Sequence, residues 1–510
     1  MKNIITFSIP VLIFLLELQL KIINVANSVK NISKHLQMGN FIGRAREPEV
    51  NLKRKLDLDE TESLTGFEVK RIKLHTTSQY IYNTLFVNGE GSDVTICALD
   101  HEWKLHKLYL RQAGYFSGMF QGSWKESELE TIHLNIPDPN ITVDSLNIAF
   151  GLLYSDDLVI ASQSVVSVLA AASLIQSDGL MQKCSQVMVE SICSTTVCEY
   201  YQTSRLYGQV KVEAACVSWL EDNLMVKHSN NNLIAEINPD LMTRIVKSHN
   251  LFVLQVEMDI YTLLRRWLYF RVNQTSHQVG EKSAVSSFFR DKFQESGKRY
   301  LETDDGKDYQ ETFHAVRYCN VIRDFMCAVE VESDGIVPGS WLFPVYRERW
   351  LSMLRVEQGI DRGPNIKPEV DGGSMRCGRI LMRDVDHCWR WNGFNFAIDL
   401  LVMYNAKTPC SLSIKRNIKS QRRVAAVGLG SQRKVIYKIK IFSLDTRGHV
   451  CACTSVGPCV AALEKDEDRV VLTHDNDKQR LTFPLYVSAT FRVVSTNEML
   501  NNFEIRPLAC

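Results

Sequence analysis

The chain has 510 residues, of which 45% are hydrophobic and 23% are charged, and its formal net charge is +1. This length predicts about three domains. A net charge near zero gives no general reason to expect a nucleic acid or an anionic membrane as a partner. Fourteen cysteines are spread over the chain, which indicates reduced thiols of a cytosolic or nuclear protein rather than a disulfide framework.

The first 37 residues contain a largely apolar stretch, Ile4 to Leu20, that superficially fits a signal peptide or a marginal membrane segment. A second methionine, Met38, is followed by Gly39. If translation began at Met38, Gly39 would be the first residue of a myristoylation-like start, although Gly43 stands where Ser or Thr is preferred. We interpret residues 1–37 as a gene-model extension or a disordered leader, with a real targeting segment as the alternative.

Two short basic clusters follow, and an acidic, polar stretch separates them. The composition of the stretch that contains these clusters lacks the apolar residues that a packed core requires and indicates disorder. We therefore expect a disordered leader with basic clusters over residues 1–75, in which 1–37 are the doubtful extension. Paired basic clusters on a flexible arm are typical of nuclear import signals. The residues that we expect to bind the import receptors are Lys53, Arg54, Lys55, Lys70, Arg71 and Lys73. The alternative is a solvated linker with ordinary charge.

The stretch between residues 92 and 127 carries the clearest fold signal. Val94, Ile96 and Ala98 alternate with their neighbours and predict a strand. Further along the chain, the sequence predicts a second strand at 103–105, helices at 106–113 and 115–120, a strand at 131–136 and a helix at 143–154. Strands followed by helices in this order predict a compact α+β domain.

Four short motifs in this domain resemble the signature of the BTB/POZ family: Ser92-Asp93-Val94, Leu105-His106-Lys107, Tyr115-Phe116 and Met119-Phe120. The resemblance implies an interaction module over residues 76–192, which forms a homodimer and has no active site.

In this family a leading helix packs across the twofold axis, and here that helix is predicted over residues 78–86. The resemblance therefore implies a dimer interface at Tyr82, Phe86, Asp93 and Lys107, the last two as buried charges near the axis. The alternative for that charged pair is an ion pair within one subunit.

The residues Trp124, Lys125 and Glu126 follow the Met-Phe helix. In adaptors of the BTB class, a hydrophobic-x-Glu triplet at this place is similar to the element that docks onto the cullin-3 scaffold. An exposed aromatic anchor supplies desolvated area, and a nearby carboxylate fixes the orientation. The alternative is that Trp124 folds back onto its own domain and Glu126 caps the next element.

Helical periodicity dominates the middle of the chain. Val253, Val256, Ile260, Leu263 and Trp267 recur at intervals of three and four residues, which predicts a buried helical face. Residues 193–357 resemble the BACK domain that commonly follows BTB, an all-α region, with a polar loop or insert expected at 271–312. Turn-forming residues at 358–374 predict a linker.

After the predicted linker, hydrophobic residues recur at every second position, which is the period of a β-strand. Val435, Tyr437, Ile439 and Ile441 alternate with a second row of residues, Ile436, Lys438, Lys440 and Phe442. This period of two, with turns between the strands, predicts a C-terminal all-β sandwich or barrel over residues 375–500. The sequence lacks the six-fold repeat with paired glycines that a Kelch propeller requires.

Motifs outside the first domain identify a narrower family. Met375-Arg-Cys-Gly-Arg379 and the stretch Trp389 to Phe396, together with Tyr80-Ile-Tyr82 and Gly122 to Ser127, strongly resemble the germ cell-less proteins. The resemblance implies a substrate receptor of a cullin-3 ubiquitin ligase at the nuclear envelope and lamina. It also implies a role in germ-cell formation or spermatogenesis, and a link to the DP family of cell-cycle transcription factors.

The sequence gives no sign of catalysis, so we expect neither an enzyme nor a cofactor. The spacing of Cys377, His387 and Cys388, and of Cys451, Cys453 and Cys459, is too irregular for a typical zinc site. Motifs such as G-x-S-x-G, H-E-x-x-H and the phosphate loop do not occur. Two functions stay open: a cullin-3 adaptor, or a nuclear-envelope scaffold or transcriptional co-regulator that uses the BTB dimer without a cullin. We expect the protein in the nucleus, at its envelope or matrix, with a cytoplasmic or plasma-membrane pool in addition.

Overall fold

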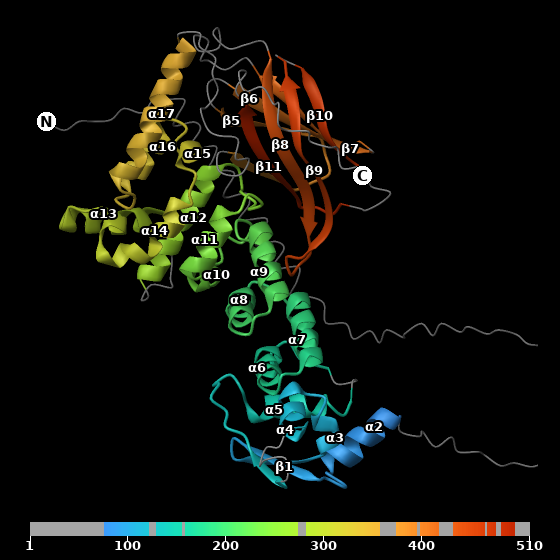
Figure 1. Cartoon of the computed structure of the whole chain (residues 1–510). Coiled ribbons are helices and arrows are strands. Elements are labelled where there is room, and N and C mark those ends of the chain that lie inside the picture. The colour runs from blue at the N-terminus through green and yellow to red at the C-terminus, as the bar shows by residue number, and fades with distance from the viewer. Residues whose placement is uncertain are drawn as a thin grey trace, which may run out of the picture. The chain divides into compact units, whose positions relative to one another are not determined.

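The structure is a computed structural model, and it describes residues 76–121, 129–155, 159–273, 282–357, 374–394, 398–407, 409–417, 432–464, 467–475 and 481–494. The predicted order of an α+β domain, a helical region and a β-sandwich is confirmed (Figure 1). Within the described residues, no helix is both long enough and apolar enough to cross a bilayer.

The α+β domain is built on a three-stranded sheet. Its elements are α2 (Thr77–Ile81), the π-helix η1 (Tyr82–Val87), β1 (Val94–Ala98), β2 (His101–Leu105), α3 (Lys107–Leu110), α4 (Gly114–Gln121), β3 (Thr131–His133), α5 (Val143–Gly151), α6 (Val165–Ile175) and α7 (Asp178–Glu190). Strand β1 lies in the middle, antiparallel to β2 and parallel to β3. The predicted alternation in β1 is confirmed, since Val94, Ile96 and Ala98 are all buried.

The helical region follows without a break in the hydrophobic core, because one cluster of buried apolar side chains extends from the α+β domain into it. Its elements are α8 (Val197–Leu206), α9 (Val210–Asn223), α10 (Asn231–Glu236), α11 (Pro239–Lys247), α12 (Glu257–Val272), α13 (Lys282–Ser296), η3 (Tyr300–Glu302), η4 (Asp304–Tyr309), α14 (Gln310–His314), α15 (Tyr318–Val321), α16 (Phe325–Ser333) and α17 (Gly339–Glu357).

Local sequence signals explain where these helices begin and end. In α11, the side chain of Asn238 accepts a hydrogen bond from the backbone N–H of Leu241, and Pro239 occupies the first turn, where its missing N–H is not needed. Arg244 and Lys247 lie in the last turn, where positive charge interacts favourably with the helix dipole.

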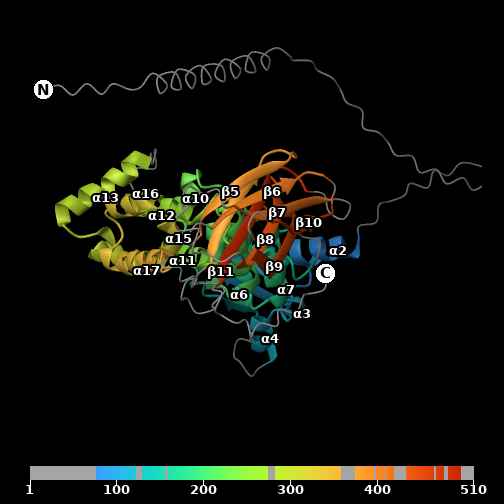
Figure 2. The same ribbon diagram turned by 90° about the horizontal axis from the view of Figure 1, so that it is seen from above.

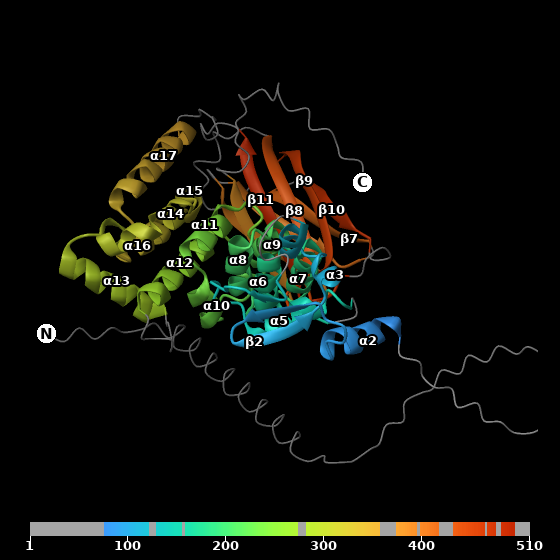
Figure 3. The ribbon, with the colours of Figure 1, turned by 60° about the horizontal axis from the view of Figure 1, so that its bottom comes forward.

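The stretch 271–312, which the sequence predicts as a polar loop or insert, contains the helix α13 and the short helices η3 and η4. Val285, Phe289, Tyr300 and Leu301 are buried within it, so part of the stretch belongs to the core and the expectation of a loop is wrong there. In three views, α12 lies between α13 and the β-sandwich (Figure 1, Figure 2 and Figure 3).

The β-sandwich consists of two antiparallel four-stranded sheets, with strand orders β10-β7-β6-β5 and β4-β11-β8-β9. The strands are β4 (Met375–Leu381), β5 (His387–Phe394), β6 (Ile398–Asn405), β7 (Cys410–Asn417), β8 (Arg433–Leu444), β9 (Val450–Leu463), β10 (Asp468–His474) and β11 (Leu485–Val494). The predicted alternation in β8 is confirmed, since Val435, Tyr437, Ile439 and Ile441 lie in the core between the sheets.

The opposite face of the second sheet packs against the helical region. On β8 this face carries Lys438, Lys440 and Phe442, which alternate with the residues of the strand that face the core of the sandwich. The Phe442 ring lies 5.8 Å from that of Phe252 and 5.3 Å from that of Tyr486. Because Phe442 and Tyr486 join the core of the helical region rather than that of the sandwich, both faces of the sheet are packed against other layers.

A buried ion pair joins β4 to α12. Both carboxylate oxygens of Glu257 accept hydrogen bonds from the guanidinium of Arg376, from Nε at 2.8 Å and from Nη2 at 2.9 Å. The backbone N–H of Arg376 also donates to Glu257, at 3.1 Å, and the Arg317 guanidinium lies 3.8 Å from the same carboxylate. All three side chains are buried. This geometry satisfies the lone pairs of the carboxylate, as a buried charge requires.

Two glycines allow the backbones of the two regions to approach closely. A Cβ at Gly378 in β4 would lie 1.6 Å from the carbonyl oxygen of Val253. Gly448 has a positive φ of 93°, and a Cβ there would lie 2.3 Å from Oδ1 of Asn223 in α9. The amide of Asn223 donates a hydrogen bond to the carbonyl of Gly448 at 2.8 Å. A side chain at either glycine would therefore separate the sandwich from the helices.

We predict that removing one partner of the Glu257–Arg376 pair destabilises the contact between β4 and α12 far more than breaking a surface ion pair does. Glu257→Gln should lower the free energy of opening of β4 by about 3–5 kcal/mol, because it leaves guanidinium charge buried without its partner. Hydrogen exchange of the β4 amides measures this free energy.

The matched control is Lys247→Met, which removes the exposed pair of Lys247 with Glu311 and should cost less than about 1 kcal/mol. Adding Arg376→Met to Glu257→Gln should cost less than the sum of the two single changes, since both remove the same interaction. Equal effects of Glu257→Gln and Lys247→Met would contradict the prediction.

Candidate functional site

The Ser92-Asp93 and His106-Lys107 motifs meet where β1 begins and α3 begins. Oδ1 of Asp93 accepts a hydrogen bond from the backbone N–H of Lys107 at 2.7 Å, and the backbone N–H of Asp93 donates to the carbonyl of Leu105 at 3.2 Å. A carboxylate at this position satisfies an otherwise unpaired N–H of the first helical turn. Asp93 therefore fixes the start of α3.

The resemblance implied that Asp93 and Lys107 are buried near a twofold axis. In the single chain Asp93 is exposed and Lys107 is half-buried. The Lys107 ammonium lies 5.6 Å from the centre of the Phe120 ring, a distance that suits a cation–π contact. Burial of the two side chains by a second subunit stays a prediction.

The histidine of the second motif has a structural role. Nδ1 of His106 lies 3.1 Å from the Tyr154 hydroxyl, and Nε2 lies 2.9 Å from the carbonyl oxygen of Glu90. The Tyr154 ring stacks on Tyr109 at 4.2 Å. Burial raises the pKa of Tyr154, so its hydroxyl stays protonated at the pH of a cell. These contacts hold the hairpin to the end of α5.

The leading helix is present as α2 and η1, and its residues differ in what they offer to a partner. Phe86 is only 9% exposed and packs inside its own chain, with ring centres 5.2 Å from Tyr82 and 5.3 Å from Tyr154. Tyr82 is half-buried. The exposed apolar side chains are instead Tyr80, at 62%, and Val87, at 60%, neither of which belongs to the predicted dimer interface. Of the two predicted aromatic contacts, Tyr82 therefore keeps more surface than Phe86.

Further exposed apolar side chains lie on the neighbouring short helices. Leu108 in α3 is 75% exposed, and Tyr115 in α4 is 38% exposed. Two views place α3 beside α2 (Figure 1 and Figure 3). Single exposed apolar residues are normal, but several on adjacent elements are typical of a protein-interaction surface. We call Tyr80, Val87, Leu108 and Tyr115 the apolar surface of the α+β domain.

The predicted cullin-binding residues Trp124, Lys125 and Glu126 lie outside the described residues. The helix that precedes them, α4, is fixed by its buried side chains Phe116 and Phe120. The described part of the chain before this segment ends at Gln121, the last residue of α4.

The other predicted site residues have no structural test. Gly39 and the six basic residues Lys53, Arg54, Lys55, Lys70, Arg71 and Lys73 all lie before residue 76, where the description begins. For the described part of the chain, no group of three or more His, Cys, Asp or Glu side chains is arranged to hold a metal ion. Every cysteine in these ranges is a free thiol.

Comparison with known proteins agrees with this architecture. Residues 82–192 match the BTB/POZ domain. The chain is 43% identical over 438 residues to human Germ cell-less protein-like 2, covering 85% of this chain and 82% of that protein. It is 43% identical over 432 residues to human Germ cell-less protein-like 1, with 84% and 82% covered. Protein germ cell-less of Drosophila melanogaster is 30% identical over 491 residues, with 91% and 85% covered.

These similarities extend well beyond the BTB/POZ domain and include the helical region and the β-sandwich. The resemblance on which the family assignment was first based is therefore confirmed over most of the chain. The protein belongs to the germ cell-less family of BTB/POZ proteins.

Proposed function

We propose that this chain is a non-enzymatic adaptor, which recruits a substrate protein to a cullin-3 ubiquitin ligase and acts as a homodimer. The observation that carries the proposal is the BTB/POZ domain at residues 82–192, in a chain of the germ cell-less family. BTB domains commonly self-associate and serve as cullin-3 adaptors. The apolar surface of the α+β domain supports self-association, because a dimer would remove these side chains from water.

An adaptor contributes position rather than chemistry. Ubiquitin transfer requires a lysine of the substrate to be held near the transferring enzyme, so a mobile receptor domain would lower the effective concentration of that lysine. The packing of the β-sandwich on the helical region suits this role. In this proposal the α+β domain holds the ligase and the sandwich holds the substrate.

The names of the relatives suggest the biological setting. The proposal places the protein in germ-cell specification or spermatogenesis, in the nucleus and at the nuclear envelope or matrix. Lamina proteins and DP-family transcription factors are the proposed additional partners, and the basic clusters at 53–55 and 70–73 are the proposed import signal. Lipidation of Gly39 would add a membrane-bound pool only together with a second membrane-binding signal, since one acyl chain binds marginally.

Self-association is tested by placing charge on the apolar surface. Tyr80→Asp combined with Val87→Asp should convert a dimer into a monomer, because a carboxylate buried in an apolar interface lacks a partner. We expect light scattering after gel filtration to report half the mass and circular dichroism to stay unchanged. The matched control is Val159→Asp, a residue that is 91% exposed elsewhere in the same domain, which should leave the mass as it is. A double variant that keeps the full mass would place the dimer contact elsewhere.

Cullin binding is tested at the predicted triplet. Trp124→Ala combined with Glu126→Ala should weaken binding of the cullin-3 N-terminal domain at least about thirtyfold, since loss of an interface tryptophan typically costs about 2 kcal/mol or more. Calorimetry with the purified full chain measures the affinity, and the dimer mass shows that the variant is folded. A folded variant with undiminished affinity would reject the triplet as the docking site. If the wild-type dimer shows no affinity at all, the alternative of a nuclear-envelope scaffold or transcriptional co-regulator replaces the adaptor.

A further inference from the structure

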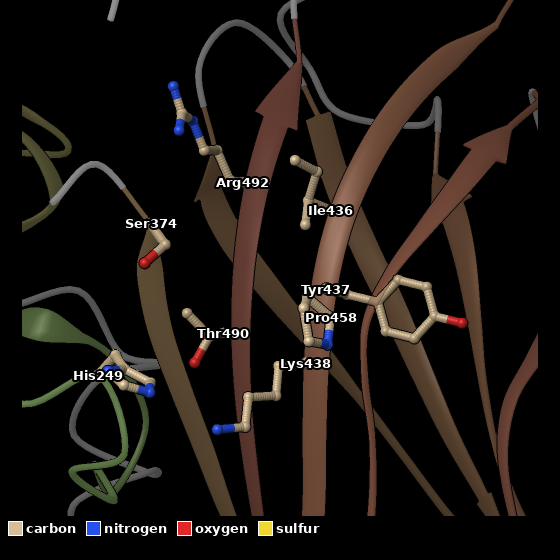
Figure 4. Close-up of a pocket in the computed structure, with 8 residues that line it drawn as sticks. All are labelled: His249, Ser374, Ile436, Tyr437, Lys438, Pro458, Thr490 and Arg492. Atoms are coloured by element: carbon tan, nitrogen blue, oxygen red, sulfur yellow. The ribbon is translucent and has the colours of Figure 1, made fainter. Parts of the chain in front are cut away.

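A pocket lies at one end of the contact between the helical region and the β-sandwich, with a volume of about 110 Å³. Its wall on the helical side is His249, which follows α11. Its wall on the sandwich side is the outer face of the sheet β4-β11-β8-β9 (Figure 4). The residues that supply its polar groups and much of its wall are His249, Ser374, Ile436, Lys438, Thr490 and Arg492. We call this the basic pocket.

The sheet fixes the spacing of the groups on the sandwich side. Thr490 pairs with Lys438 across β11 and β8, and Arg492 pairs with Ile436. Residues two apart in a strand project from the same face, so these four side chains share one surface. The Tyr437 ring extends to the opposite side of β8 from the Lys438 side chain (Figure 4). The groups are therefore held by paired strands rather than by a loop.

Lys438 supplies the positive charge on which anion binding at the basic pocket depends. None of the described residues that line the pocket is acidic. The Lys438 ammonium donates a hydrogen bond to Oδ1 of Asn250 at 2.8 Å. Because Asn250 is a neutral amide, this bond orients the ammonium without neutralising it.

The next lysine on the same face of β8 shows the contrast. The Lys440 ammonium lies 2.6 Å from a carboxylate oxygen of Asp222, so its charge is paired within the protein. Lys438, two residues away, has an amide in place of the carboxylate. The difference leaves one lysine of the row available for an anion from outside.

The walls of the pocket restrict which anion fits. Ile436 and Pro458 contribute apolar surface beside the polar groups. The volume of about 110 Å³ is smaller than the cavity of about 150 Å³ that holds a benzene ring. It suits a short side chain whose methylene groups contact Ile436 while its charged end reaches Lys438 and the Thr490 hydroxyl (Figure 4). A free inorganic ion would leave the apolar part of the wall without a contact.

We propose that the basic pocket binds an anionic side chain of a peptide, either the carboxylate of Asp or Glu or the phosphoryl group of a phosphorylated Ser. In the anion complex the Lys438 ammonium and the Thr490 hydroxyl donate charge-assisted hydrogen bonds, which are stronger than those between neutral groups. That the peptide belongs to a substrate protein rests on the proposed adaptor function. Binding of the anionic side chain does not depend on that function.

The test uses the full chain labelled with carbon-13 at the isoleucine methyl groups, because Ile436 lines the pocket. Ile436→Val identifies the Ile436 signal by its loss. The probes are three glycine-rich pentapeptides with phosphoserine, glutamate or serine in the centre, and inorganic phosphate at matched ionic strength. One charged contact corresponds to a millimolar Kd, so titration extends to about 10 mM.

We expect the phosphoserine or the glutamate peptide to shift the Ile436 methyl signal saturably, and the serine peptide to leave it in place. Inorganic phosphate should require a higher concentration. If neither anionic peptide moves the signal, or if the serine peptide moves it equally, the proposal is overturned. If phosphate saturates the site at the same concentration as the peptide, the ligand is a free anion and the assignment to a peptide side chain is wrong.

Substitutions separate charge from shape. Lys438→Met removes the charge but keeps a long unbranched side chain, and it should raise the Kd of the anionic peptide at least about tenfold. Lys438→Arg keeps the charge and should keep most of the affinity. The matched control is Lys434→Met on the same face of β8, where Lys434 is exposed and does not line the pocket. Equal losses from Lys438→Met and Lys434→Met would indicate long-range attraction instead of a site.

The outcome is independent of cullin binding. Lys438→Met should bind the cullin-3 N-terminal domain as the wild type does. A chain that lacks cullin affinity but titrates with the anionic peptide would refute the adaptor function and retain the pocket. A chain that binds the cullin but whose Ile436 methyl signal does not respond to the anionic peptide would support the adaptor function and refute the pocket.

Discussion

The buried carboxylate of Glu257, shared by the guanidinium groups of Arg376 and Arg317, is the interaction on which the arrangement of the helical region and the β-sandwich depends. A buried ion pair is weak support for stability, because desolvation offsets most of the attraction. Its larger effect is to fix one position of β4 on the helical region. Arg376 also donates to the carbonyls of Val246 and Ser248, at 2.9 and 2.7 Å, so a shifted position of β4 would leave several buried groups without partners.

This constraint connects the fold to the proposed function. The aromatic contacts of Phe252 with Phe442 and Tyr486 supply the apolar part of the same interface. At the far end, the Trp219 indole donates to the carbonyl of Arg447, in the turn between β8 and β9. Contacts at both ends and in the middle of the sheet oppose rotation of the sandwich, which suits a receptor that must present its substrate at a fixed place. The basic pocket lies along the same interface, between His249 and the sheet.

The sequence predicts which segments form strands and helices better than it predicts what packs against them. Alternation in β1 and in β8 indicates a buried strand face directly, and the side chains that it assigns to the core are buried. The same alternation gives no information on what covers the opposite face. Lys438 and Lys440 therefore resemble a solvated row in the sequence, although the row packs on helices. Phe442 in that row is the signal that could have indicated a second buried face.

The candidate sites show the same limit. Helical periodicity groups Tyr82 with Phe86 but does not distinguish a side chain that faces its own core from one that faces a partner, and Phe86 faces its own core. The basic pocket joins residues from five separate segments of the chain, represented by His249, Ser374, Lys438, Pro458 and Thr490. Spacing along the chain cannot reveal such a site, because only the packing of sheet against helices brings these residues together.

The fixed arrangement of sandwich and helices is tested most directly by the distance between two spin labels, at Leu206 in α8 and Val470 in β10. Both side chains are exposed, so the labels should not disturb the core. Labels attached to unnatural amino acids avoid the native cysteines, and dilution with unlabelled chain removes distances between subunits. Pulsed electron resonance on the full chain should give one narrow distance distribution. A broad distribution, or two separate maxima, would show that the sandwich moves freely and would contradict its role as a rigidly held receptor.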